Sequence, residues 1–302
     1  MKILLAGGTG LIGSALIGSI TQNEDQVALI SRSPAELNPE LNPIPWELDR
    51  ISQVMESTDV VINLAGASIA GSSPLSMRWT PKRKSLIKSS RIKAGEMLTR
   101  AIQNSSHKPE LFIQASAIGY YGNQGNQPAD ESTFSGDDFL ADVCKDWEES
   151  TSAVEELGVR RVITRLGLVL STSGGLLPLL SLPFKFYLGG PLGSGKQPMS
   201  WIHIEDVVQA YHYFIQHPTT QGTYNLTAPT PVDNLTFSTA IGKTLNRPDW
   251  LKVPANAVKL TLGEASTLAL EGREVLPKRL LEAGYEFKFN LIDKALINLF
   301  HN

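Results

Sequence analysis

The sequence has little cysteine: Cys144 is the only one among 302 residues. One thiol cannot form an intrachain disulfide, and it excludes a metal site built from several cysteines. The five histidines show no spacing that is typical of metal ligands. We therefore expect a protein of a reducing compartment with no metal site.

Long hydrophobic runs and an excess charge are also missing. No apolar run approaches the ~20 residues of a membrane span, and the longest candidate, 176–186, contains two prolines and a lysine. Only four apolar residues follow Lys2 before a glycine cluster, fewer than a signal peptide needs. The 27 Lys and Arg residues nearly balance the 30 Asp and Glu residues, which argues against nucleic-acid or membrane partners. We expect a cytoplasmic protein that acts on a small molecule.

The first half of the chain alternates short buried-strand patterns with helical patterns. Such alternation predicts βαβ units and a parallel sheet. After 167 the pattern changes, because 171–198 is rich in Gly, Pro and Leu and has no clear period. We expect this stretch to pack over a site. The predicted strands are 2–6, 27–30, 59–65, 111–115, 161–165 and 222–226, and the predicted helices are 11–20, 90–103, 139–157, 204–216 and 235–245.

A glycine-rich turn joins the first strand to the first helix. Gly7, Gly10 and Gly13 are three residues apart, where a tight turn, close approach of a diphosphate and close helix–strand packing require small residues. The helix N-terminus adds partial positive charge. We expect the dinucleotide at Gly7, Thr9, Gly10, Leu11, Ile12 and Gly13.

The fold class predicted is α/β, a Rossmann-like doubly wound parallel sheet over 1–170, with 200–228 returning to it. A smaller, partly discontinuous region, 171–199 and 229–302, is expected on the substrate side. The end of the second strand carries Ser31 and Arg32 instead of the acid that typically binds the ribose of NAD. A guanidinium and a hydroxyl suit a 2′-phosphate, so we expect NADP as cofactor. The alternative is that Arg32 is a solvated loop residue.

These features resemble the extended branch of the short-chain dehydrogenase/reductase superfamily. The chain is most similar to its atypical YfcH-like group of "epimerase family" proteins. The resemblance implies cofactor contacts at Leu64, Ala65, Gly66 and Leu168, and it aligns Arg91 with a cofactor-facing Asn. Arg91 then reaches the cofactor or a substrate phosphate, whereas a solvated helical face is the alternative for the basic stretch around it. The segments that carry the resemblance are 63–66, 121–122, 139–148, 189–195, 200–206, 224–226, 271–277 and 283–285.

The resemblance also shows where the chain departs from the superfamily. A Tyr-x-x-x-Lys pair normally exchanges the proton while hydride moves to or from nicotinamide, but Leu140 and Cys144 align with it here. The usual catalytic hydroxyl falls at Ala117, and Ser116 lies one residue earlier, where a strand points to its other face. Candidate catalytic residues are Ser116, Tyr120 and Tyr121, and packing at the loop is the alternative for both tyrosines.

The glycine-rich segment 185–203 is expected to cover the substrate, as a mobile lid or as a rigid loop. Its polar and aromatic candidates are Gln197, Trp201 and His203, and a structural role is the alternative for His203. The sequence thus favours an NADP(H)-binding oxidoreductase or epimerase-like protein. Its expected substrate is a small molecule, and this class includes nucleotide-linked compounds. The alternative is a regulator or sensor that binds NADP(H) without catalysis.

Overall fold

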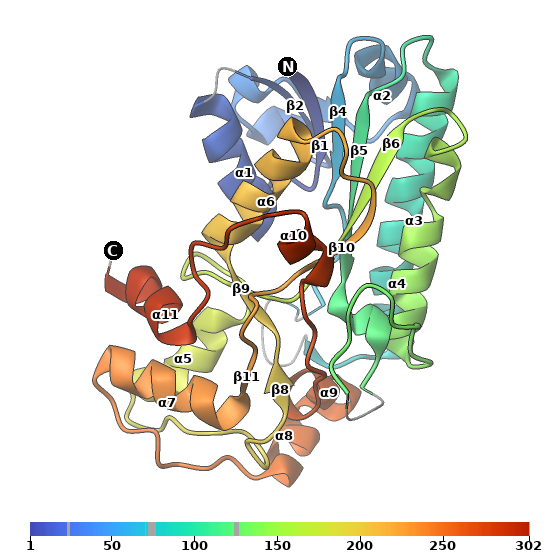
Figure 1. Cartoon of the computed structure of the whole chain (residues 1–302). Helices are drawn as coiled ribbons and strands as arrows, with labels where there is room; N and C mark the ends of the chain where they lie inside the picture. The colour runs from blue at the N-terminus through green and yellow to red at the C-terminus, as the bar shows by residue number, and fades with distance from the viewer. Residues whose placement is uncertain (23–24, 70, 72–76, 124–126, 302) are drawn as a thin grey trace.

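A seven-stranded parallel sheet forms the centre of the computed structural model, which describes residues 1–22, 25–69, 71, 77–123 and 127–301 (Figure 1). Its strand order is β3-β2-β1-β4-β5-β6-β10, and every neighbouring pair is parallel. The prediction of a Rossmann-like doubly wound sheet is confirmed. The strands are β1 (Lys2–Ala6), β2 (Gln26–Ser31), β3 (Pro43–Pro45), β4 (Val60–Asn63), β5 (Leu111–Ala117), β6 (Arg160–Leu166) and β10 (Gly222–Leu226).

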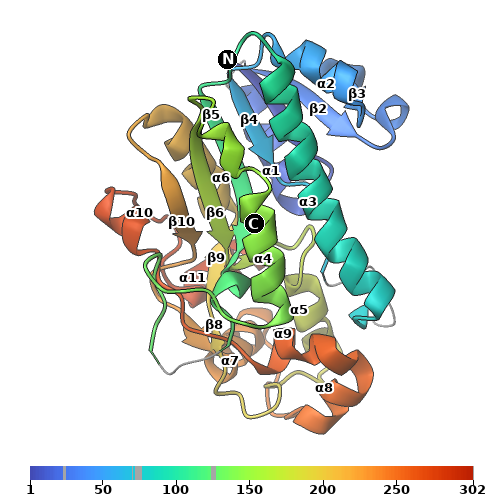
Figure 2. The same cartoon turned by 90° about the vertical axis from the view of Figure 1, so that its right-hand side faces the viewer.

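Helices cover both faces of this sheet. Successive side chains along a strand point to opposite faces, and in β1 the apolar side chains on both faces are buried. Ile3 and Leu5 of β1 pack with helices α1 and α6 on one face, whereas Leu4 and Ala6 face α2 and α3 on the other. Figure 2 shows α3 and α4 side by side across that second face. The helices are α1 (Leu11–Gln22), α2 (Leu48–Met55), α3 (Pro81–Asn104), α4 (Phe139–Glu149) and α6 (Ile204–Gln216).

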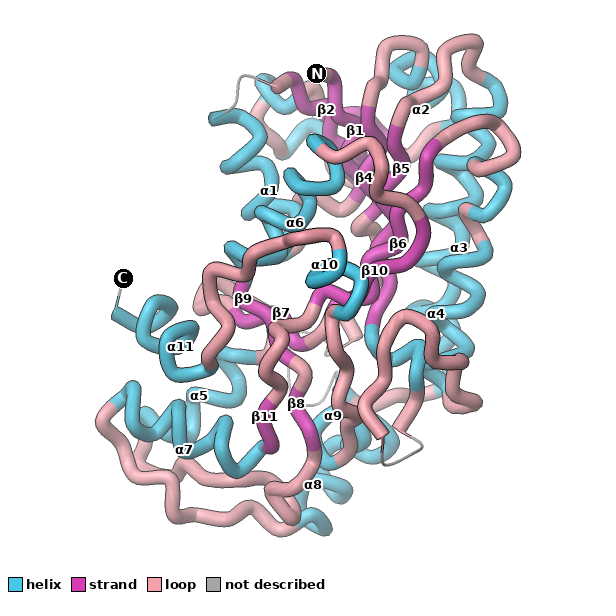
Figure 3. The backbone as a smooth tube through the Cα atoms, viewed as in Figure 1, coloured by secondary structure: helices cyan, strands magenta, loops and turns pink. Residues whose placement is uncertain are grey.

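A second region has its own core beyond the carboxyl ends of the strands (Figures 1 and 3). Trp201, Phe237 and Leu296 are fully buried in it or nearly so. Within the described residues, no helix combines the length and the apolar character needed to cross a membrane. The elements here are β7 (Leu168–Leu170), β8 (Pro198–Met199), β9 (Trp201–His203), β11 (Val232–Asp233), α5 (Leu177–Lys185), α7 (Asn234–Leu245), α8 (Ala255–Leu262), α9 (Thr267–Leu270), α10 (Lys278–Glu282) and α11 (Ile292–His301).

Two predicted helix boundaries were wrong. Helix α3 begins at Pro81 rather than at 90, because the Thr80 hydroxyl caps it by accepting a hydrogen bond from the Arg83 amide at 3.2 Å. Helix α4 ends at Glu149 rather than at 157 and is followed by a 3-10 turn at Ser152–Val154. The Gly- and Pro-rich stretch also contains a helix that was not predicted, α5.

Candidate functional site: a cavity at the carboxyl ends of the strands

The turn between β1 and α1 leaves no room for a side chain at Gly7 or at Gly13. Gly7 has φ +85°, and a Cβ there would lie 2.7 Å from the Leu64 carbonyl. A Cβ at Gly13 would lie 2.5 Å from the Gly7 carbonyl oxygen. Thr9 and Gly10 are exposed, and Leu11 and Ile12 line a cavity at the start of α1. This cradle of backbone at a helix N-terminus fits a dinucleotide diphosphate.

The loops after β2 and β4 flank this turn. The half-buried Ser31 hydroxyl accepts a hydrogen bond from the Ser33 amide at 3.1 Å. Arg32 is exposed, and within the described residues its guanidinium has no ion-pair partner. After β4, the buried Asn63 side chain accepts a hydrogen bond from the Ala65 amide at 3.1 Å and fixes the Leu64–Gly66 turn beside Gly7.

The cavity extends from this turn into the second region and has a volume of about 920 Å³. Leu64, Gly167 and Leu168 line it, and so do Leu262 and Leu268 of the C-terminal segment. Most of its wall consists of Leu, Ile, Val, Met and Ala side chains. Such a cavity binds a ligand through burial of apolar surface and through a few polar contacts.

Helix α4 presents apolar groups to this cavity. Leu140 and Cys144, at the positions of the superfamily's Tyr and Lys, both line it. Burial raises the pKa of the Cys144 thiol to about 12, so the thiol stays protonated near neutral pH. Neither side chain can exchange a proton with a substrate as a tyrosine–lysine pair does.

Ser116 and Tyr121 belong to a buried polar network beside the cavity. The Ser116 hydroxyl donates to Glu148 at 2.6 Å, and Arg165 binds both oxygens of that carboxylate at 2.9 and 2.8 Å. Arg165 also donates to the Tyr121 hydroxyl at 3.0 Å, and this hydroxyl donates to Asn225 at 2.7 Å. Burial raises the pKa of Tyr121 to about 12.

This placement does not fit the prediction that Ser116 or Tyr121 donates a proton to a substrate. Neither residue lines the cavity, and each hydroxyl already donates its proton inside the protein. Tyr120 does not line the cavity either, and the centre of its ring lies 3.3 Å from the Arg165 guanidinium carbon. Glu148 and Arg165 were not predicted as members of this network. The sequence signal was a charged residue, Arg165, at the end of the predicted strand 161–165, and the structure pairs it with Ser116 of β5.

The predicted substrate-side residues have two different environments. Gln197 lines the cavity and donates to the Leu192 and Ala269 carbonyls at 3.0 and 2.8 Å. Trp201 and His203 do not line it, and their substrate-side role remains a prediction. Trp201 is fully buried in the core of the second region. The His203 Nδ1 accepts a hydrogen bond from the Glu205 amide and caps α6, and its ring stacks on Phe289.

Arg91 is a buried cation on the cavity wall. Its Nη1 donates to the Ala67 and Ile87 carbonyls at 3.0 and 2.9 Å, and its guanidinium lies over the Trp147 ring. Within the described residues, its Nε has no hydrogen-bond partner and no carboxylate pairs with it. The described residues also contain no cluster of His, Cys, Asp and Glu that could hold a metal ion.

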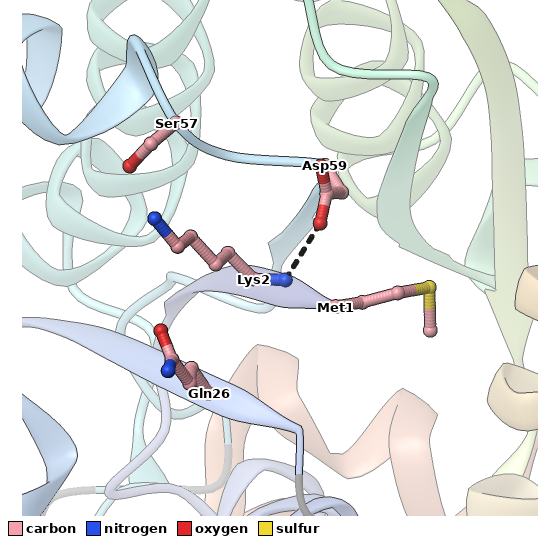
Figure 4. Close-up of a pocket in the computed structure, with 5 residues that line it drawn as sticks. All are labelled: Met1, Lys2, Gln26, Ser57 and Asp59. Carbon is pink, nitrogen blue, oxygen red and sulfur yellow. Dashed lines mark hydrogen bonds between the residues drawn. The ribbon is translucent and has the colours of Figure 1, made fainter.

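A hollow at the opposite, amino ends of the strands is a poor candidate for the site. Figure 4 shows that it is lined by Met1, Lys2, Gln26, Ser57 and Asp59, with the Lys2 amide donating to Asp59 at 2.8 Å. Ligands of open parallel sheets bind at the carboxyl ends of the strands instead. The large cavity is therefore the candidate site.

The chain belongs to the NAD dependent epimerase/dehydratase family, whose model matches residues 3–227. A domain of unknown function (DUF1731) matches residues 253–299. The chain is 38% identical to the epimerase family protein YfhF of Bacillus subtilis, over 99% of this chain and 98% of that protein. It is 36% identical to an Arabidopsis thaliana chloroplastic homolog of the epimerase family protein SDR39U1, over 98% of this chain and 86% of that protein.

A solved structure of a relative has the same fold as this chain. The human epimerase family protein SDR39U1, crystallised with NADPH, has a TM-score of 0.91 and 31% identity, and the match covers both chains completely. The resemblance to the epimerase family seen in the sequence is thus confirmed.

Proposed function

We propose that this chain is an NADP(H)-dependent oxidoreductase or epimerase-like enzyme that acts on a small substrate without a Tyr-x-x-x-Lys pair. The observation that carries the proposal is the continuous cavity, which runs from the glycine turn across α4 to the C-terminal segment. When bound, the cofactor supplies or accepts a hydride. The human relative crystallised with NADPH supports this choice of cofactor.

The chain's own residues would bind, orient and exclude water. The Gly7–Gly13 turn would hold the diphosphate, and Ser31 and Arg32 would hold the 2′-phosphate. Leu64–Gly66 and Leu168 would flank the middle of the cofactor. Leu140 and Cys144 would form an apolar wall and leave proton exchange to the substrate or to water.

A calorimetric titration tests the cofactor assignment. We expect NADPH to bind more tightly than NADH, and Arg32→Ala to weaken NADPH binding at least tenfold (about 1.4 kcal/mol) with little effect on NADH. Arg100→Ala, which removes another exposed arginine at the far end of α3, is the matched control and should change neither affinity. Equal affinities for the two cofactors would remove the role of Arg32.

A cofactor-dependent sensor is the second candidate function. It is favoured by one observation: Leu140 and Cys144 provide no proton donor, and the nearby Ser116 and Tyr121 hydroxyls are engaged in the buried network. NADPH oxidation measured over a panel of carbonyl compounds and nucleotide sugars separates the two. Turnover supports the enzyme, whereas tight NADPH binding without turnover on any compound supports the sensor.

A further inference from the structure

Arg91 carries a positive charge that no carboxylate among the described residues neutralises. The residue is only 7% exposed, and in that part of the chain only backbone carbonyls accept its hydrogen bonds. A guanidinium does not lose its proton in proteins, so the cost of burying this charge remains until an anion pairs with it. Burial and the nearby Arg83 both act against the charge and lower the pKa of Arg91 to about 10.

The surroundings hold this cation in one place. A Cβ at Gly66 would lie 3.0 Å from the Arg91 guanidinium carbon, so the glycine leaves room for it. On the other side, the guanidinium carbon lies 4.8 Å from the centre of the Trp147 ring. Trp147 is one turn along α4 from Cys144, and both line the cavity. Arg91 therefore places its charge between α4 and the Leu64–Gly66 turn, which itself lies beside Gly7.

The other charged groups of the cavity wall have a different character. In the described part of the chain, only Glu271 and Arg273 line the cavity in addition to Arg91. Glu271 is exposed and accepts a hydrogen bond from Asn123, and Arg273 is half-buried and donates to the Tyr121 and Gln127 carbonyls. Arg91 is thus the one buried charge that this cavity wall presents.

The remaining wall is apolar, and so is part of its rim. Leu179, Leu182 and Leu188 line the cavity and yet are 44%, 48% and 54% exposed. Exposed leucines at the mouth of an apolar cavity favour a ligand that buries them. One buried cation inside such a cavity selects a ligand with an apolar body and a single anionic group.

We propose that Arg91 binds the carboxylate of an otherwise apolar substrate. The inference rests on the proposed function, because the same cavity would hold the cofactor, and it gives that function a substrate class. The Arg91 guanidinium would pair with the carboxylate, and the leucine-rich wall would cover the apolar body. A nucleotide sugar, whose surface is mostly polar, fits this wall poorly.

A matched pair of probes tests the proposal: 4-phenylbutyrate and its neutral amide, titrated by calorimetry into protein saturated with NADP⁺. We expect the acid to bind the unsubstituted protein at least tenfold more tightly than the amide, so the ratio of the amide dissociation constant to the acid dissociation constant is at least ten. In Arg91→Met this acid–amide ratio should fall to about one, and in Arg91→Lys most of it should remain. The ratio is taken within each variant, so a loss of folded protein does not change it. No binding of the acid at millimolar concentration overturns the proposal.

Two further arms exclude the rival anion sites. If Arg273→Met abolishes the acid–amide ratio while Arg91→Met keeps it, Arg273 holds the carboxylate and the proposal is wrong. If Arg91→Met weakens NADP⁺ binding at least tenfold and keeps the ratio, Arg91 serves the cofactor and the proposal is again wrong. The ratio is also measured without NADP⁺. Failure of NADP⁺ to bind the unsubstituted protein would contradict the proposed function and still leave the ratio measurable.

Discussion

Two glycines of α1 differ in what an added methyl group would meet. A Cβ at Gly13 would lie 2.5 Å from the Gly7 oxygen and the Gly8 Cα, whereas a Cβ at Gly18 would meet nothing within 4 Å. We expect Gly13→Ala to lower the free energy of unfolding by about 2 kcal/mol and to abolish NADPH binding. Gly18→Ala should raise the free energy of unfolding by up to about 1 kcal/mol, because alanine favours the helix. Urea unfolding and calorimetry measure both effects, and equal effects at the two sites would contradict the packing argument.

The burial of His203 leads us to expect that the folded protein loses stability in mild acid. Burial lowers its pKa to about 4 from the usual 6.5, so the unfolded chain takes up the proton first as the pH falls. Stability from this group is therefore present above pH 6.5 and is lost between pH 6.5 and 4. Between pH 7 and pH 5 the unsubstituted protein should lose about 2 kcal/mol more than His203→Asn, which keeps a capping acceptor for α6.

Denaturant unfolding at the two pH values measures this difference. Asp206 lies in the same helix turn, and burial raises its pKa, which has the opposite effect on stability in acid. Because Asp206 is present in both proteins, its contribution cancels in the comparison. An equal pH dependence in the two proteins would show that His203 does not titrate as its burial predicts.

At the scale of elements, the Glu148–Arg165 ion pair fastens α4 to the sheet. Glu148 on α4 and Arg165 on β6 are both buried, and Ser116 of β5 joins them. We expect Arg165→Met to lower the free energy of unfolding by about 3–5 kcal/mol, because it leaves the Glu148 carboxylate buried without its counterion. Lys88→Met on α3 is the control, because it breaks the exposed ion pair between Lys88 and Asp146 of α4 and should cost less than about 1 kcal/mol.

Chemical denaturation of both variants checks this prediction. Similar losses would mean that the buried pair contributes no more than an exposed one. A loss of NADPH binding in Arg165→Met, measured while the protein is still folded, would further indicate that the pair sets the position of α4 against the cavity.

The elements that the sequence predicted are those whose signals are local. The strands of the parallel sheet are continuous apolar runs, and α1 follows a glycine turn with a known spacing. Helix α5 was missed because Pro178 and Pro183 argue against a helix, although Pro178 lies in its first turn, where proline is tolerated. Strands β7 to β9 have two or three residues each and depend on pairing with distant segments.

The same distinction separates the two halves of the site. The turn at Gly7–Gly13 could be predicted because its geometry depends on its own residues. The environment of Ser116 could not, because the hydroxyl is engaged by Glu148, 32 residues away along the chain. For Trp201 and His203, aromatic and polar character suggested a ligand, but the packing of α11 and of the segment before it buries both in the second core.

At the scale of the whole molecule, the sheet and the second region are interdependent. The chain leaves the sheet after β6, builds β7, α5, β8 and β9, and returns to the sheet edge as β10. The Asn225 side chain of β10 donates to the Leu276 carbonyl, and the Glu131 carboxylate accepts hydrogen bonds from the Asn225 and Arg279 amides. These contacts join the C-terminal segment to the sheet that would hold the cofactor.

This interdependence predicts one cooperative unfolding transition. In hydrogen exchange measured under native conditions, peptides from β5 and from α7 should report the same free energy of opening, which is that of global unfolding. On the proposed function, NADPH at 100 times its dissociation constant should raise that free energy by about 2.7 kcal/mol in both peptides, since the cofactor binds only the folded state. Exchange of α7 at a lower free energy, unchanged by NADPH, would show that the second region opens by itself. The cavity would then be open to solvent while the sheet is still folded, and its far wall could not hold a substrate against the cofactor.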